Sequence, residues 1–148
     1  MIQKTSDPLP DHPADRREGR LKLAVVERHR ASEFVCSARV TLEAPDGAVH
    51  EGEASLPLND QNYLRVACLA TLAALGRVVG TEGELRLVGL RSIRVFDTAV
   101  VAVQIALRSQ GHERLLLGIA VAGEDSAVGA ARAVLHATNR LVRNVVER

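Results

Sequence analysis

One order of secondary-structure elements, strand–strand–strand–helix, occurs twice along the 148 residues of the chain. Residues 21–80 contain three short segments with strand patterns and then one long helical segment, and residues 84–148 contain the same order. Gly47 and Gly111 lie in matching hairpin turns, about 64 residues apart. Two such units predict an α+β fold in which two βββα units each form an antiparallel sheet covered by a helix.

The first unit shows the strand pattern most clearly in residues 34–42, where every second side chain is apolar. That alternation predicts a strand with one buried face. The Pro45-Asp46-Gly47 turn predicts a hairpin to the next strand, and Asp60 is expected to be the N-cap of the helix. We therefore expect strands over residues 21–27, 34–42 and 48–54, and a helix from residue 60 to residue 77 or 79.

The second unit has a change of phase near Gly89, which predicts a β-bulge in its first strand. Gln110-Gly111-His112 is the turn of its second hairpin, and Glu124-Asp125-Ser126 is expected to cap the last helix. We expect strands over residues 85–95, 98–108 and 115–122, and a helix from residue 126 almost to residue 148.

Residues 1–19 precede the repeat and differ from it in composition. Pro8, Pro10 and Pro13 lie there among mixed charges. Because prolines remove backbone donors and the polar run has little to bury, we predict a disordered N-terminal leader. Residues 20–148 are expected to form a single domain, since this length can bury a sizeable core.

The balance of charge and apolar residues argues against two classes of partner. The formal net charge is only +1, and the helix dipole accounts for Arg143 and Arg148 near the end of the last helix, so we expect no nucleic acid. No apolar run reaches the roughly 18 residues of a membrane span, so we expect no membrane partner. The N-terminus lacks a signal pattern, which predicts a cytoplasmic location.

Aromatic residues make up only 2% of the chain, and Cys36 and Cys68 are its two cysteines. A core of Ala, Val and Leu can be close-packed, but it offers few rings for stacking nucleobases, sugars or flavins. The two thiols lack a C-x-x-C spacing, so we expect both to be reduced and buried.

Two segments are apolar on more sides than one βββα unit can cover. The helix over residues 61–79 is apolar nearly all round, and the strands over residues 99–107 and 115–122 are apolar on both faces. Such surface needs cover, either from the other half of the chain or from another chain. Of these two we favour another chain, and we expect a homodimer.

The sequence contains no catalytic constellation. Phosphate-cradling loops and nucleophile elbows are absent, and no two histidines stand at the i+2 or i+4 spacing of metal ligands. His50 beside Glu51 and Glu53 is the nearest approach to an acid–base group, but adjacent strand residues point to opposite faces. We therefore expect no enzymatic activity, no catalytic residue, no metal site and no cofactor.

Tyr63 is the only tyrosine, and it lies in the first turn of the first helix. A helix N-terminus presents free N–H groups that suit a carboxylate, so a small amphipathic molecule such as an amino acid could bind there. The alternative is that Tyr63 packs over the sheet edge with its hydroxyl in water. The candidate site comprises Leu58, Asn59, Asp60, Tyr63, Val66 and Ala67.

The second unit carries small-residue motifs of a known domain: residues 92–99, the strand over 100–107, the Gly111 turn, residues 117–122 and residues 127–141. Its helix contains the pattern A-x-x-A-x-x-x-A-x-N-R, here Ala130, Ala133, Ala137, Asn139 and Arg140. These stretches resemble the C-terminal allosteric (dimerisation) domain of the 2-isopropylmalate synthase and citramalate synthase family. The resemblance covers residues 21–145 in architecture and residues 92–142 in recognisable motifs.

The resemblance implies a pair of βββα units that dimerises and binds a feedback amino acid, leucine or isoleucine. It adds Asp97 to the candidate ligand-binding residues and supports the positions of Tyr63, Val66 and Ala67. The chain departs from the family at residues 56–60, which replace a G-x-G-P turn, and it has no room for the catalytic barrel. We expect a non-catalytic, stand-alone regulatory-type domain, dimeric, with a branched-chain amino acid or related small carboxylate as ligand. The alternative is a structural or protein-interaction dimerisation module that binds a protein partner and no small ligand.

Overall fold

The computed structural model describes residues 21–30, 32–80 and 84–146, and the predicted leader lies outside them. Each half contains three strands and then a helix, which confirms the predicted α+β class. The bulge predicted near Gly89 is present, since the register shifts between Leu87 and Gly89. The elements are β2 (Lys22–Arg30), β3 (Val35–Glu43), β4 (Val49–Pro57), α2 (Asp60–Val79), β5 (Glu84–Val95), β6 (Thr98–Ser109), β7 (His112–Val121) and α3 (Ser126–Val146).

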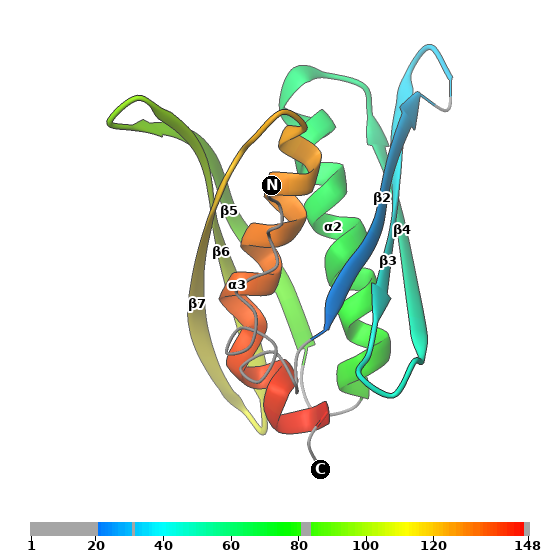
Figure 1. Cartoon of the computed structure of the whole chain (residues 1–148), viewed down its shortest axis with the longest axis vertical. Coiled ribbons are helices and arrows are strands. Elements are labelled where there is room, and N and C mark those ends of the chain that lie inside the picture. The colour runs from blue at the N-terminus through cyan, green and yellow to red at the C-terminus, as the bar shows by residue number, and fades with distance from the viewer. Residues whose placement is uncertain (1–20, 31, 81–83, 147–148) are drawn as a thin grey trace, which may run out of the picture.

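The two helices lie side by side between the two sheets (Figure 1). One antiparallel sheet has the order β2-β3-β4, and the other has the order β5-β6-β7. Helix α2 packs on β3 and β4, α3 packs on β6 and β7, and the helices contact each other. Each sheet therefore buries one face against the helices and leaves its other face outside.

The helix N-cap is Asn59, so the prediction of Asp60 as the cap was wrong. Asn59 has an extended backbone, and its Oδ1 accepts the backbone N–H of Asn62 at 2.8 Å. Asp60 is the first helical residue, where its charge still favours the positive end of the helix dipole. Because Asn and Asp are equally good caps, two of them in succession leave the boundary undecided by sequence.

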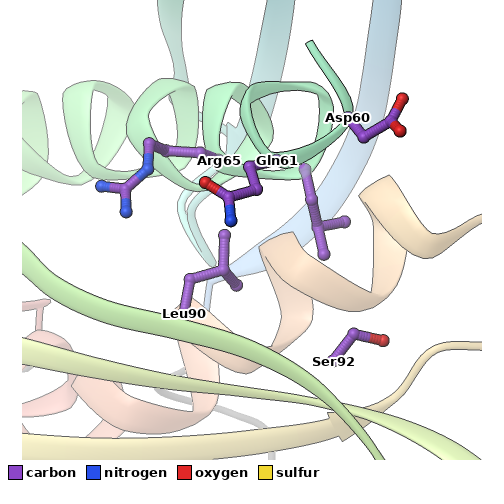
Figure 2. Close-up of a pocket in the computed structure, with 6 residues that line it drawn as sticks. Asp60, Gln61, Arg65, Leu90 and Ser92 are labelled. Atoms are coloured by element: carbon purple, nitrogen blue, oxygen red, sulfur yellow. The ribbon is translucent and has the colours of Figure 1, made fainter.

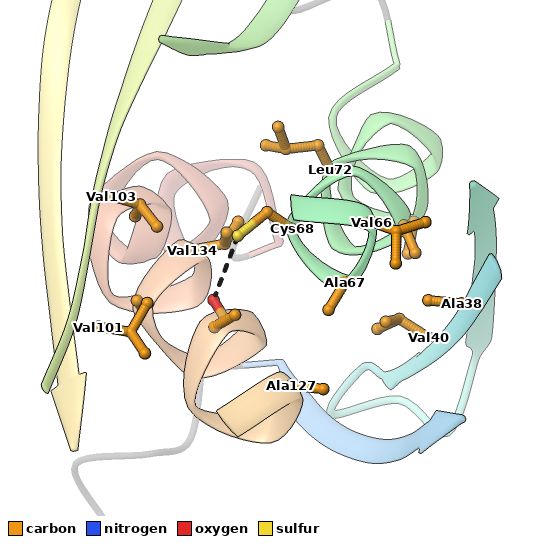
Figure 3. Packing of buried hydrophobic residues seen from close by; sticks show 14 of the residues in the cluster. Ala38, Val40, Val66, Ala67, Cys68, Leu72, Val101, Val103, Ala127 and Val134 are labelled. Atoms are coloured by element: carbon orange, nitrogen blue, oxygen red, sulfur yellow. Dashed lines mark hydrogen bonds between the residues drawn. The ribbon is translucent and has the colours of Figure 1, made fainter. Parts of the chain in front are cut away.

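The core is made of small aliphatic side chains from both sheets and both helices (Figure 3). Cys68 on α2 points at α3, with its Sγ 4.0 Å from the carbonyl oxygen of Ala130. Cys36 and Cys68 are both free and buried, as predicted. The buried cluster includes Ala38, Val40, Val66, Ala67, Val101, Val103, Ala127 and Val134.

Two strand glycines let the helices approach the sheets closely. A Cβ at Gly52 of β4 would overlap the backbone of α2 at Ala70 and Ala74. A Cβ at Gly118 of β7 would overlap the carbonyl oxygen of Ala133 and lie 2.6 Å from the nitrogen of Ala137 in α3. The same device thus recurs in the third strand of each unit, and it brings backbones close enough for a core of Ala and Val to be close-packed.

Helix α2 is apolar nearly all round because it lies at the centre of the fold. It contacts β3, β4, β5 and α3, so the chain itself covers it. Its length and hydropathy of 1.3 would also allow it to cross a membrane, but half of it is buried inside the fold, and core helices meet the same criteria. The outer side of β6 and β7 is different, because no described element lies over it.

Candidate functional site

The sequence-predicted site residues separate into three groups. Asn59, Asp60 and the partly exposed Tyr63 lie at the start of α2, and the nearby Leu58 packs against the core. Asp97 lies in the turn between β5 and β6, where its carbonyl oxygen accepts a hydrogen bond from Arg94 at 3.1 Å.

Val66 and Ala67 both have zero exposure and belong to the hydrophobic core. Neither side chain can contact a molecule that binds at the surface of the fold. The start of α2 is therefore available to a ligand only through its exposed polar residues and the first turn of the helix.

Tyr63 packs against the edge strand β2. The residue is 38% exposed, and the guanidinium of Arg28 covers its ring. The guanidinium carbon of Arg28 lies 4.0 Å from the ring centroid, and its Nη1 donates to the carbonyl oxygen of Tyr63 at 3.5 Å. Arg28 also lies 4.0 Å from the carboxylate of Asp125, before α3. This cation–π contact ties β2 to both helices and occupies the ring face that a ligand would need.

A cavity of about 360 Å³ lies beside the start of α2, on the side that faces β5 (Figure 2). Its wall on the helix comes from positions i, i+1, i+4 and i+5, which share one helical face. Its wall on the strand comes from two alternate residues of β5 that point toward the helix. The lining residues are Asp60, Gln61, Leu64, Arg65, Leu90 and Ser92.

The polar groups of this cavity have no partners within the described part of the chain. Arg65 is half-buried, and among the described residues it makes no ion pair and no side-chain hydrogen bond. Asp60 is likewise without a partner there, five residues before Arg65 on the same helix. The two charged side chains extend from opposite ends of the lining (Figure 2), so the cavity offers a cation, an anion and the apolar surface of Leu64 and Leu90 to a small molecule.

The sequence prediction found Asp60 but missed Gln61, Leu64, Arg65, Leu90 and Ser92. The i+4 spacing of Leu64 from Asp60 was visible in the sequence and places these two residues on one helix face. Leu90 and Ser92 could not be found in this way, because the packing of β5 against α2 joins two units that are separate in sequence. The bulge at Gly89 also changes which β5 residues point inward.

A second, more open hollow surrounds β2, and its charges are already paired. It is lined in part by Glu27, Arg28, Arg39 and Asp125. Arg39 lies 3.7 Å from Glu27 and donates to Glu53 at 2.9 Å, and these carboxylates, Glu53 first, raise the pKa of Arg39. A cluster that satisfies its own charges has little left to offer a charged ligand.

The hairpin of His50, Glu51 and Glu53 forms no acid–base group. His50 pairs with the buried Leu42, so it lies on the inner face of its sheet. Glu53 lies on the outer face and is hydrogen-bonded to Arg39. Among the residues that the structure describes, no three His, Cys, Asp or Glu side chains could together hold a metal ion.

Comparison with models of protein families and with curated protein sequences finds no match to this chain. The resemblance to the allosteric domain of the 2-isopropylmalate synthase family therefore stays a prediction from the motifs quoted above.

Proposed function

We propose that this chain is a non-catalytic, regulatory-type domain that dimerises and binds a branched-chain amino acid or a related small carboxylate. The ligand occupies the cavity between the start of α2 and β5. Arg65 binds its carboxylate, Asp60 attracts its ammonium group, and Leu64 and Leu90 contact its aliphatic side chain.

The observation that carries this proposal is the guanidinium of Arg65, which has no hydrogen-bond or ion-pair partner among the described residues and lies beside two leucines. An Arg binds a carboxylate through two parallel hydrogen bonds, which gives both affinity and orientation. The cavity volume of about 360 Å³ is at the small end of the usual range for ligand sites, which favours a single amino acid over a nucleotide or a peptide.

Isothermal titration calorimetry with leucine, isoleucine and valine tests the proposal. We expect saturable heat with at least one of them at or below millimolar concentration. Leucinamide, which keeps the side chain and ammonium group but lacks the carboxylate, should bind at least about 10-fold more weakly. No heat from any of the three amino acids at millimolar concentration would refute ligand binding.

Arg65→Gln is the decisive variant, because it removes the charge and keeps the aliphatic stem and a polar end group. It should weaken binding about 10- to 100-fold. Arg77→Gln is the matched control, since Arg77 lies exposed in the last turn of the same helix and does not line the cavity. Equal loss in both variants would indicate a general effect of charge on the helix.

The alternative function is a structural or protein-interaction dimerisation module without a small ligand. It is favoured by the apolar outer side of β6 and β7, which no ligand in the cavity would contact. This alternative predicts a protein that self-associates and gives no calorimetric response, with a protein partner in pull-down experiments.

A further inference from the structure

The outer face of the β5-β6-β7 sheet carries a continuous row of exposed aliphatic side chains along β7. Leu116 and Ala120 pack against the core, so the residues between and beside them point outward. Leu117 is 74% exposed and Leu115 is 57% exposed, and Ile119 and Val121 continue the row. A row of this size on a sheet face is unusual for surface that stays in water.

The equivalent face of the other sheet is mainly polar, although Val25 and Val49 are exposed on it. Its outward side chains include Glu27, Arg39 and Glu53, one from each strand, which are joined across the sheet at 3.7 and 2.9 Å. Both sheets bury their inner faces in the same way, so the fold does not require an apolar outer face on either. The difference therefore points to a specific occupant for the β5-β6-β7 face.

The face has a ridge beside a shallow strip. Along the strip on β6 lie Val100, Ala102, Gln104 and Ala106, which pair in register with Val121, Ile119, Leu117 and Leu115 of β7. Ala106 is only 2% exposed and Val100 only 6%. At the Ala106 end, Arg86 of β5 reaches across β6 to within 3.7 Å of Glu113 on β7, so the open part of the strip runs from Val100 to Gln104 beside the ridge.

We propose that this face is the dimer interface, with a second copy of the chain packed on it about a twofold axis parallel to the strands and between β6 and β7. The inference rests on the dimeric part of the proposed function. The β7 ridge of each copy then lies on the β6 strip of the other, so that Leu117 faces Gln104 of the second copy. Such an interface is isologous, because the same patch serves both copies.

Gln104 supports a second copy over an unrelated occupant. It is half-buried in the middle of the strip, and among the described residues its amide has no hydrogen-bond partner. Sheets pack about 10 Å apart, so two Gln104 side chains related by this axis can reach each other. An amide both donates and accepts, so two symmetry-related amides can exchange a pair of N–H···O hydrogen bonds.

No described element of the chain covers this face. Residues 1–20 are rich in proline and charged side chains and contain few large apolar residues. The edge of β7 is also partly occupied, because the backbone N–H of Ile119 donates to Nδ1 of His136 on α3 at 3.0 Å. We therefore expect the apolar row along β7 to be buried by a second sheet stacked on this face, and not by an additional strand at the β7 edge.

The β6 and β7 strips overlap over about 10 by 25 Å, or about 250 Å² in projection, whereas stable interfaces bury about 800 Å² per partner. The tip of the β5–β6 hairpin supplies further contact. It bends away from the helices toward the outer side of its sheet (Figure 1) and carries Phe96, which is 95% exposed. Ile93 and Val95 near it are also exposed. Arg86 and Arg91 lie beside the β6 strip, opposite Ala106 and Ala102, and Arg86 is ion-paired with Glu113 of β7 at 3.7 Å.

The test is the molar mass measured by light scattering and sedimentation at about 100 µM, where a small interface with a micromolar Kd is dimeric. The wild-type chain should be a dimer. Leu117→Asp should weaken it about 100-fold or more, because a charge would be buried without a partner. The matched control is Val49→Asp on β4, 58% exposed on the other sheet, which should leave the mass unchanged.

Charge variants at Gln104 test the twofold axis itself. Gln104→Glu and Gln104→Lys should each be monomeric, because like charges would face each other across the axis. An equimolar mixture of the two should form a heterodimer. A mixture that stays monomeric, a monomeric wild type, or a dimer that survives Leu117→Asp would each overturn the proposal. These outcomes are independent of ligand binding, which the Arg65→Gln titration measures separately.

Discussion

Among the described glycines, Gly118 is the one whose added Cβ would come nearest to a helix backbone, so one methyl group tests how closely α3 packs on β7. In Gly118→Ala the added Cβ would overlap the carbonyl oxygen of Ala133 and lie 2.6 and 2.7 Å from the nitrogen and Cβ of Ala137. All of these atoms belong to the backbone or to a Cβ, so no side chain can rotate away. Helix α3 as a whole must move.

The size of the effect follows from that movement. Carbon atoms in contact are about 3.5 to 4.0 Å apart, so α3 must shift by about 1 Å from β7. Overpacking of this kind costs about 1 to 3 kcal/mol, and the gain from replacing a strand glycine returns at most about 1 kcal/mol. We expect Gly118→Ala to lower the free energy of unfolding by about 2 kcal/mol, and Tm by about 4 to 8 °C.

Gly76→Ala is the matched control, because it makes the same change with the opposite expected sign. Gly76 lies in α2, is exposed, and has nothing within 4 Å of the position of an added Cβ. A helical glycine replaced by alanine without a clash stabilises by about 0.5 to 1 kcal/mol.

The assay is urea denaturation followed by far-ultraviolet circular dichroism, with all variants at one protein concentration, since dimerisation would couple stability to concentration. If Gly118→Ala were within about 0.5 kcal/mol of wild type while Gly76→Ala stabilised, the close packing of α3 on β7 would be refuted. Gly52→Ala should behave like Gly118→Ala, because its added Cβ would meet the backbone of α2 in the same way.

Three further predictions concern the cap, the edge strand and the core thiol. Asn59→Ala should cost about 1 kcal/mol of unfolding free energy, whereas Asn59→Asp should keep most of it. A double-mutant cycle of Arg28→Met and Tyr63→Leu, measured by urea denaturation, should give a coupling of about 0.5 to 1 kcal/mol, and zero coupling would contradict the cation–π contact. Burial raises the pKa of Cys68 from 9.0 to about 12, so the folded state favours the neutral thiol. This contribution to the free energy of unfolding is present below pH 9 and is lost between pH 9 and 12, at up to about 1.4 kcal/mol per pH unit. Urea denaturation at pH 8 and pH 10 should show the loss for the wild type and not for Cys68→Ala.

Most of the fold could be predicted because its signals are local. Alternation in residues 36–42, the turns at Gly47 and Gly111, and the phase change at Gly89 each involve neighbours in sequence, and each agrees with the structure. The same alternation places Phe34 on the buried face, and this was wrong, because Phe34 lies before β3 and is 76% exposed. The errors at element ends are also local: β2 extends to Arg30, and β7 begins at the hairpin turn. In these places the pairing partner, and not the strand's own sequence, decides where the strand ends.

The candidate site was harder to predict because it depends on contacts between the two units. Val66 and Ala67 follow the start of α2 closely in sequence, yet they point into the core, since α2 is covered on nearly all sides. Arg65 and Leu90 face one cavity only because β5 of the second unit packs beside α2 of the first. No period or spacing within one unit contains that information.

The comparison of the two units separates what the fold requires from what it leaves free. Each unit needs an apolar inner face, and each needs a glycine in its third strand, here Gly52 and Gly118, where its helix approaches. Neither unit needs an apolar outer face, as the ion-paired outer face around Arg39 demonstrates. Apolar residues that serve no packing within the chain therefore carry information about partners, and the row around Leu117 is the largest set of them on a sheet face within the described residues. The low aromatic content fits this distinction between residues that the fold requires and residues that it leaves free. The strand glycines bring the backbones together and leave a core too narrow for aromatic rings, and Phe96 lies exposed at the hairpin tip, outside that core.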